Sequence, residues 1–231
     1  MTKKIVEADV LYEDNHLIAL NKKASDIVQG DKTGDEPLNE KLKQFLREKY
    51  SKPGNVFVGT IHRIDRPVSG VVLFAKTSKG LARMNELFRE DKIEKTYWAV
   101  VKNRPELETD TITHYLIKNQ QKNKSFATKD AAKKGLKSTL TYTLINSSDN
   151  YHLIEVKPIT GRHHQIRVQL AAIGSPIKGD LKYGFDRTNK DASIHLHARK
   201  VSFEHPISKE KIEITAPVPD EALWKYFESL V

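Results

Sequence analysis

No cysteine occurs among the 231 residues of the chain. A disulfide framework, a thiolate nucleophile and a zinc site with cysteine ligands are therefore excluded. The sequence also lacks an uninterrupted apolar stretch long enough to span a bilayer. Residues 1–5 lead directly into a strand-like pattern, without the apolar segment of a secretory signal. We therefore expect a soluble protein that works in the cytoplasm.

Two motifs of nucleotide-binding proteins are missing as well. The chain contains no G-x-x-x-x-G-K-[ST] phosphate loop and no G-x-G-x-x-G segment after a strand. Chemistry driven by nucleotide hydrolysis and hydride transfer from a dinucleotide therefore have no support in the sequence.

Positive charge is abundant. Lysine and arginine number 39 against 30 aspartates and glutamates, which gives a formal net charge of +9. Such an excess indicates a polyanionic partner or an acidic membrane surface, although a protein that is basic only for solubility would show it too. Hydrophobic residues make up 38% of the chain, which is ample for a packed core.

Apolar periodicity predicts alternating strands and helices. We expect strands at residues 10–12, 16–20, 57–61, 71–75, 95–101, 139–145, 151–156 and 194–203. We expect four helices. Two lie at residues 37–50 and 220–230. A third runs from a cap at Thr77 or Ser78 to Phe88, and a fourth runs from Pro158 to about Ala172 with Thr160 as N-cap. No repeat, linker or composition shift marks a boundary. The pattern therefore predicts a single α+β domain over residues 1–231, with a mixed, largely antiparallel central sheet flanked by helices.

The segment 58–70 places one carboxylate, Asp65, between cationic neighbours. His62, Arg63 and Arg66 lie within three residues of it, in a break between two apolar strands. Such surroundings favour the ionised form of a carboxylate. Taken alone, the segment favours a structural ion pair at a strand end over a loop that holds an anionic polymer beside a reactive group.

Histidines occur in two pairs. On the helix expected from Pro158, His163 and His164 share a face with Arg167, so they indicate either a phosphate site near the helix N-terminus or a structural role. His195 and His197 alternate on an expected strand, where both rings would lie on one face as half of a metal site. No third ligand stands at a useful spacing, so polar surroundings or RNA are the better interpretation.

A further stretch, residues 118–137, is crowded with lysines. Charge runs of this kind usually form a solvated hairpin or loop. An arm that contacts phosphates is the other interpretation, and the sequence alone favours neither.

Five segments, taken together, resemble a known family. Residues 62–70, HRIDRPVSG, resemble the H-R-L-D-x-x-T-S-G signature of the RluA-type pseudouridine synthases. The other segments match that family in the same order along the chain, and the ordered set is highly specific. They are 95–101 (KTYWAVV), 161–168 (GRHHQIRV), 173–180 with 183–184 (IGSPIKGD and YG), and 196–198 with 203–206 (LHA and FEHP).

The resemblance implies an isomerase that converts uridine to pseudouridine in structured RNA, ribosomal or transfer, without cofactor or metal. In such enzymes the bond between the ribose and the uracil nitrogen breaks, the base rotates, and carbon 5 is joined to the sugar. The implied partner of this chain is RNA, with no membrane and no metal, and we expect a monomer.

By the same resemblance Asp65 is the essential carboxylate, which attacks the anomeric carbon or removes a proton from ribose carbon 2; both routes stay open. Arg167, rather than the neighbouring Arg66, is expected to pair with Asp65. Tyr97 would contact the uracil and is a candidate for the late proton removal at carbon 5. Arg63 would fill the gap left when the target uridine flips out. The remaining expected RNA contacts are His62, Arg66, Arg162, His163 and His164.

Several positions depart from the family pattern. Val68 and His163 stand where threonine is usual, and Gln169 and Ser175 stand where histidine is usual. These residues lie beside the expected catalytic ones. Residues 21–25, NKKAS, match the N-K-P-A-G motif of the family only in part. Many relatives carry a small RNA-binding domain before the catalytic one, and we expect none here because the catalytic pattern begins within the first dozen residues.

Two other functions are compatible with parts of the pattern. One is a catalytically silent RNA-binding protein of the same fold, against which the joint presence of Asp65, Tyr97 and Arg167 speaks. The other, remote, is a phosphodiesterase that uses the histidines at 163, 164, 195 and 197.

Overall fold

The structure is a computed structural model that describes residues 4–30 and 34–231. The first three residues of the expected N-terminal pattern thus lie outside the described part. The chain divides into two compact units. The first comprises Met1–Glu94 with Ala198–Pro217, and the second comprises Lys95–His197 with Val218–Val231.

Antiparallel pairing dominates the sheet of the first unit. Strand β2 (Leu17–Lys22) pairs with β1 (Val10–Glu13) on one side and with β4 (Ser69–Ala75) on the other. The short β3 (Gly59–Thr60) adds to β4, and β11 (Lys211–Thr215) pairs with β10 (Leu196–Glu204), most of which belongs to this unit. The register between β2 and β4 runs from Leu17 opposite Ala75 to Lys22 opposite Gly70.

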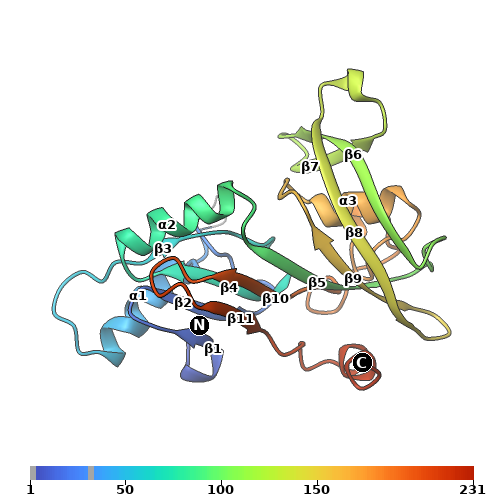
Figure 1. Ribbon diagram of the computed structural model, residues 1–231. Coiled ribbons are helices and arrows are strands. Elements are labelled where there is room, and N and C mark those ends of the chain that lie inside the picture. The colour runs from blue at the N-terminus through green and yellow to red at the C-terminus, as the bar shows by residue number, and fades with distance from the viewer. Residues whose placement is uncertain (1–3, 31–33) are drawn as a thin grey trace. The chain divides into compact units, whose positions relative to one another are not determined.

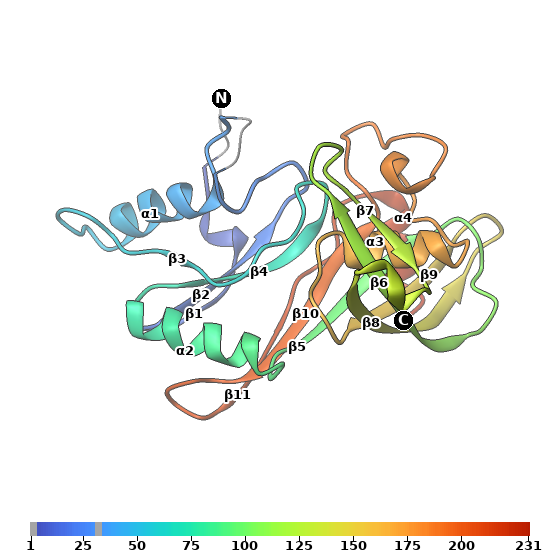
Figure 2. The same ribbon diagram turned by 90° about the horizontal axis from the view of Figure 1, so that it is seen from above.

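Two helices complete the first unit. Helix α2 (Ser78–Arg89) begins at Thr77, whose hydroxyl accepts the amide of Gly80, so the expected cap is confirmed. Its Met84 is buried against β2 and β4 in one apolar cluster. Helix α1 (Leu38–Lys49) buries its leucines at 38, 42 and 46, the stripe that helical periodicity predicts. Figure 2 shows both helices beside the strands that they cover.

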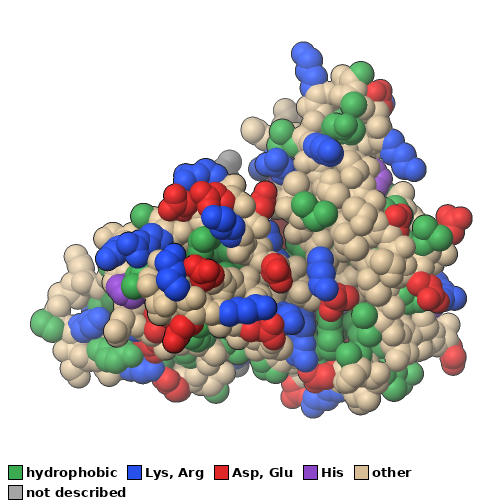
Figure 3. Space-filling model, viewed as in Figure 1, with side chains coloured by type: hydrophobic (Ala, Val, Ile, Leu, Met, Phe, Trp, Pro, Cys, Tyr) green, Lys and Arg blue, Asp and Glu red, His purple; other side chains and the backbone are tan. Residues whose placement is uncertain are grey.

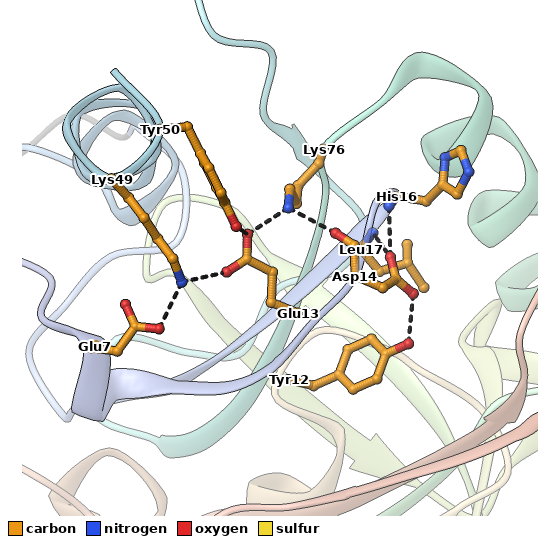
Figure 4. Close-up of polar contacts among 9 residues, drawn as sticks. All are labelled: Glu7, Tyr12, Glu13, Asp14, His16, Leu17, Lys49, Tyr50 and Lys76. Carbon is orange, nitrogen blue, oxygen red and sulfur yellow. Dashed lines mark hydrogen bonds and ion pairs between the residues drawn. The ribbon is translucent and has the colours of Figure 1, made fainter. Parts of the chain in front are cut away.

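A polar cluster around Glu13 ties these elements together (Figure 4). The Glu13 carboxylate accepts hydrogen bonds from Lys76 Nζ at 2.5 Å, Lys49 Nζ at 2.8 Å and the Tyr50 hydroxyl at 2.8 Å. Burial by itself would raise the pKa of Glu13, but the bonds from Lys49 and Lys76 outweigh it and hold that pKa below its ordinary value. The end of α1, the end of β1 and the residue after β4 are thereby joined.

The second unit is built on a five-stranded antiparallel sheet. The strand order is β5 (Glu94–Val101), β9 (His152–Pro158), β8 (Leu136–Ser147), β6 (Thr109–Asn119) and β7 (Lys124–Thr128). Helix α3 (Gln165–Ala172) packs against β6 and β7, where Val168 meets Leu116 (Figure 1). Helix α4 (Ala222–Glu228) buries Trp224 and Phe227 against β5 and β9.

The expected α+β class and largely antiparallel strands are confirmed. Three strands, β6, β7 and β11, are absent from the predicted elements, and the other differences lie in the element bounds. The run predicted as a strand at 57–61 is extended only at Gly59–Thr60, and the closing helix is shorter than expected, Ala222–Glu228. Short 3-10 turns occur at Glu7–Asp9, Ala131–Lys133 and Leu181–Tyr183. Within the described residues, no helix is long and apolar enough to cross a bilayer.

Candidate active site

Asp65 lies in a loop of the first unit, between β3 and β4. Its carbonyl accepts the amide of Val68 at 3.0 Å, which closes a turn around Arg66 and Pro67. The side chains of Ile64 and Val68 are buried on either side, whereas Asp65 is half-buried. The apolar neighbours therefore anchor the loop and leave the carboxylate at its edge.

Lys22, a residue with no predicted role, holds this loop in place. The Lys22 side chain is only 1% exposed, and its ammonium donates to the carbonyls of Val68 at 2.6 Å, Lys23 at 2.9 Å and Arg66 at 3.0 Å. The amide of Ser25 donates to the same Arg66 carbonyl at 3.0 Å. The strand β2 is thus fastened to the turn that follows Asp65.

Lys22 also contributes a charge beside Asp65. Burial lowers the pKa of Lys22 to about 7, and the carboxylates of Asp26 and Asp65 counteract that shift. Because three carbonyl oxygens surround the ammonium, its protons are fully used. In its protonated form Lys22 fixes the loop that carries Asp65.

The sequence neighbours of Asp65 have distinct surroundings. His62 Nε2 accepts the amide of Leu73 at 3.0 Å, and its ring stacks on Phe88 with centroids 5.1 Å apart. Arg66 forms an ion pair with Asp35 at 2.7 Å. Arg63 is exposed. His62 therefore has a structural contact in addition to its expected one with RNA.

The glycine that ends the signature, Gly70, is required for steric reasons. Gly70 has φ of +112°, and a Cβ at this position would lie 2.3 Å from the carbonyl oxygen of Ala198. Only glycine allows β4 to approach β10 so closely in this backbone conformation.

In the second unit, Arg167 lies in the first turn of α3 and is buried. Its Nε donates to Asp180 Oδ2 at 2.7 Å and its Nη2 to Asp180 Oδ1 at 2.9 Å, a bidentate pair in which both side chains are almost inaccessible. The guanidinium carbon lies 5.1 Å from the centre of the Tyr183 ring. Asp180 and Tyr183 thus fix the orientation of Arg167.

The helix that carries Arg167 begins later than predicted. Residues 158–164 are not helical, and the N-cap is His164, with φ of 54°. Thr160 is not a cap, because its hydroxyl instead donates to Gln165 Oε1 at 2.8 Å, the oxygen that also accepts the amide of Arg162 at 2.9 Å. The expectation that His163 and His164 share a helical face with Arg167 is therefore wrong.

The two histidines form a stacked pair instead, with centroids 3.8 Å apart. His163 Nδ1 lies 2.9 Å from the Ser125 hydroxyl and His163 Nε2 lies 3.2 Å from Asn123 Oδ1. His164 Nδ1 lies 2.9 Å from the Tyr183 hydroxyl. The pair thus connects the turn before α3 to the β6–β7 hairpin.

His195 precedes β10 rather than lying within it, so the expected alternation with His197 on one strand is wrong. Both rings pack against Trp224, at 5.2 and 5.8 Å between centroids. His195 Nε2 donates to Glu221 at 3.1 Å, and burial lowers the pKa of His195. In the part of the chain that is described, no group of three or more metal-ligating side chains is arranged to hold a metal ion.

Tyr97 lies in β5 opposite Val156 and is half-buried. Its neighbour Trp98 points to the opposite face, into the core with Trp224. Tyr97 is therefore on the face of β5 opposite that core. Arg162 is exposed.

The three expected catalytic residues are divided between the units. Asp65 belongs to the first, and Tyr97 and Arg167 belong to the second. The expected pairing of Asp65 with Arg167 stays a prediction. The supporting residues Lys22, Asp180 and Tyr183 were missed, although each stands in a segment that resembles a family motif.

The chain matches the RNA pseudouridylate synthase family over residues 16–172, a span that contains the Asp65 loop, Tyr97 and Arg167. The chain belongs to this family. The expected family and enzyme class, an RNA pseudouridine synthase and thus an isomerase, are confirmed.

Curated relatives agree with this family assignment. The chain is 34% identical over 219 residues to the ribosomal large subunit pseudouridine synthase C of Haemophilus ducreyi, with 92% of this chain and 66% of that protein covered. It is 32% identical over 223 residues to the protein of the same name from Vibrio cholerae, with 93% and 68% covered. The chain thus spans about two thirds of the length of these relatives.

Solved structures show the same fold. The human RNA pseudouridylate synthase domain containing 4 protein superposes with a TM-score of 0.79 at 20% identity, over 95% of this chain and 92% of that one. The human domain containing 1 protein gives 0.71 at 20% identity, over 96% and 94%. The expected pseudouridine synthase fold is confirmed.

Proposed function

We propose that this chain isomerises specific uridines to pseudouridine in the RNA of the large ribosomal subunit. The proposal rests on the match to the RNA pseudouridylate synthase family over residues 16–172, together with relatives named for the ribosomal large subunit. The formal net charge of +9 suits a polyanionic substrate. Transfer RNA is the alternative substrate of the same chemistry.

Asp65 is the proposed reactive carboxylate. In one route its oxygen attacks the anomeric carbon and displaces uracil, and the bond to the carboxylate breaks again when carbon 5 of the rotated base attacks the same carbon. In the other, Asp65 removes the proton of ribose carbon 2 as uracil leaves, and the proton returns when carbon 5 bonds to the sugar. Both routes need a carboxylate held in place, and the bonds of Lys22 to the turn after Asp65 support this.

Arg167 and Tyr97 complete the proposed machinery. Arg167 would pair with the Asp65 carboxylate and keep it ionised, which requires a guanidinium held in one orientation, as Asp180 and Tyr183 hold it. Tyr97 would contact the uracil ring and accept the proton that leaves carbon 5.

The RNA contacts are proposed around the same residues. Arg63, which is exposed, would occupy the gap left by the flipped uridine, because a planar guanidinium can stack among bases and meet phosphate. Further contacts are proposed for His62, Arg66, Arg162, His163 and His164. We take residues 1–231 as one catalytic domain that acts as a monomer in the cytoplasm without metal or cofactor.

Mapping of pseudouridine in ribosomal and transfer RNA tests this function. RNA from cells with and without the gene is compared, and the deletion strain is complemented with the intact chain. We expect one or a few sites in large-subunit RNA to lose pseudouridine on deletion and regain it on complementation. An unchanged map, with no isomerisation of the same RNA by the purified protein, would instead identify a silent RNA-binding protein.

A further inference from the structure

The lysine-rich stretch is a hairpin built onto the segment before α3. Residues 118–137 comprise the end of β6, the turn, β7, a 3-10 turn and the start of β8. The Ser125 hydroxyl donates to the carbonyl of His163 at 2.8 Å, and the Ser125 amide donates to the Tyr183 hydroxyl at 2.8 Å. Lys182 Nζ donates to the carbonyl of Asn123 at 3.0 Å. These bonds give the hairpin a fixed position relative to α3.

The two faces of the hairpin differ. On the inner face Leu116 and Ala127 are packed against α3. On the outer face Ile117 stands directly opposite Phe126, and these side chains are 38% and 45% exposed. The next position on this face, Tyr115, is half-buried and stands opposite Lys137 of β8. An aromatic and aliphatic strip is therefore open to solvent.

Lysines surround this strip. Lys124 Nζ lies 5.8 Å from the centre of the Phe126 ring. Where β6, β7 and β8 end, Figure 3 shows several basic side chains around hydrophobic ones, with little acidic surface. Among the described residues no ion pair joins the lysines of the hairpin to an acidic side chain, and Asp130 is the one acidic residue in the stretch. The seven lysines are Lys118, Lys122, Lys124, Lys129, Lys133, Lys134 and Lys137.

We propose that the outer face of this hairpin is an RNA-binding platform that holds unpaired nucleotides of the substrate away from the reacting uridine. Bases stack on Phe126 and Tyr115, and the lysines neutralise the phosphates between them. The inference rests on the proposed function, since it assumes that the substrate is RNA.

The outer face of the hairpin continues with hydroxyl groups that can bind RNA. Beyond Tyr115 it continues as pairs of threonine hydroxyls, 2.9 Å apart for Thr113 and Thr139 and 2.8 Å apart for Thr111 and Thr141. Hydroxyl groups can donate to and accept from ribose 2′-hydroxyls and phosphates. Aromatic rings interleaved with cations favour a nucleic acid over a protein, whose interfaces are depleted in lysine.

The experiment measures affinity for two probes, a fluorescent oligouridylate of about 12 nucleotides and unmodified large-subunit RNA transcribed in vitro. Isomerisation of the transcript is measured in parallel. The hairpin variants are Phe126→Ala, Phe126→Trp and the double variant Lys122→Gln with Lys137→Gln. The matched controls are Phe57→Ala, whose side chain is 44% exposed, and Lys79→Gln with Lys211→Gln, both exposed lysines of the first unit.

We expect Phe126→Ala to weaken oligouridylate binding about ten-fold and Phe126→Trp to retain it, because stacking needs only an aromatic face. The lysine double variant should reduce the slope of log K against log salt by roughly 1 to 2. The controls should match the wild type in both respects.

Two outcomes overturn the inference. One is wild-type affinity of all hairpin variants for both probes, with isomerisation intact. The second is an equal loss in the controls. If the wild type binds oligouridylate through Phe126 but isomerises no RNA, the platform stands and the proposed function fails.

Discussion

Arg167 and Asp180 form a bidentate ion pair that is almost inaccessible to solvent, with N–O distances of 2.7 and 2.9 Å. The pair joins the first turn of α3 to the turn that leads into the 3-10 segment Leu181–Tyr183. It gives the Arg167 cation a fixed orientation, so the geometry of the guanidinium depends on Asp180.

The first prediction concerns this pair. Asp180→Asn removes the carboxylate that binds the buried Arg167 guanidinium in bidentate geometry, so we expect the free energy of unfolding to fall by about 3–5 kcal/mol in urea denaturation. Arg167→Lys should also destabilise, because an ammonium cannot make the bidentate contact. As a control, Glu108→Gln breaks the exposed pair with Arg104 in the same unit and should cost less than about 1 kcal/mol. Equal stability of Asp180→Asn and Glu108→Gln would contradict the role given to Asp180.

The second prediction concerns Lys22. Lys22→Met removes the ammonium that donates to three carbonyl oxygens, two of them in the turn after Asp65. The Arg66 carbonyl keeps the amide of Ser25 as a donor. We expect a loss of about 2–4 kcal/mol of stability and a fall in kcat that exceeds any change in RNA affinity. Lys23→Met, which removes a half-exposed lysine paired with Asp9, is the control. A variant at position 22 that is less stable yet has the kcat of the wild type at low temperature would show that Lys22 does not position Asp65.

The third prediction concerns pH. The pKa of Glu13 is lower in the folded protein than its ordinary value of 4.5, so the unfolded chain binds more protons in the acid range. The contribution of Glu13 is therefore complete above about pH 4.5 and is lost as the pH falls through the folded pKa. Glu13→Gln should lower the free energy of unfolding by about 1–2 kcal/mol at neutral pH. It should also make that free energy depend less steeply on pH in the acid range. Glu106→Gln, which replaces an exposed carboxyl group, should leave this pH dependence as steep as in the wild type.

The fourth prediction concerns Gly70. Gly70→Ala would place a Cβ 2.3 Å from a backbone oxygen in a left-handed conformation, and neither strain can relax without moving β4. We expect the midpoint of thermal unfolding to drop by at least about 8 °C. Gly30→Ala, at a position with no atom within 4 Å, should leave it nearly unchanged. Similar midpoints for the two variants would refute the steric argument.

Local periodicity was enough to predict most elements. The strands β2, β4 and β9 were found because apolar side chains alternate or run together there, and α1 and α2 because their leucines recur at helical spacing. The start of α3 was missed for a tertiary reason. Threonine is a residue type favoured at N-caps, but the hydroxyl of Thr160 donates to the Gln165 side chain. The helix begins after His164, whose backbone is left-handed.

The supporting residues of the site could not be predicted for the same kind of reason. A lysine in a strand is normally exposed, and the carbonyls that accept from Lys22 lie up to 46 positions further along the chain. Asp180 stands in a recognisable motif, yet only the folded turn brings it to Arg167. Asp65, Tyr97 and Arg167, by contrast, were assigned from motifs whose order along the chain is specific.

The most direct test of the central claim is the activity of Asp65→Asn. Large-subunit RNA labelled with tritium at carbon 5 of uridine releases the label to water when pseudouridine forms, and the release is followed alongside RNA affinity and thermal stability. We predict that Asp65→Asn folds and binds RNA within about three-fold of the wild type, while release falls at least about 1,000-fold, the loss of a group required in the transition state. Release within ten-fold of the wild-type rate would contradict the assignment of Asp65 as the essential carboxylate.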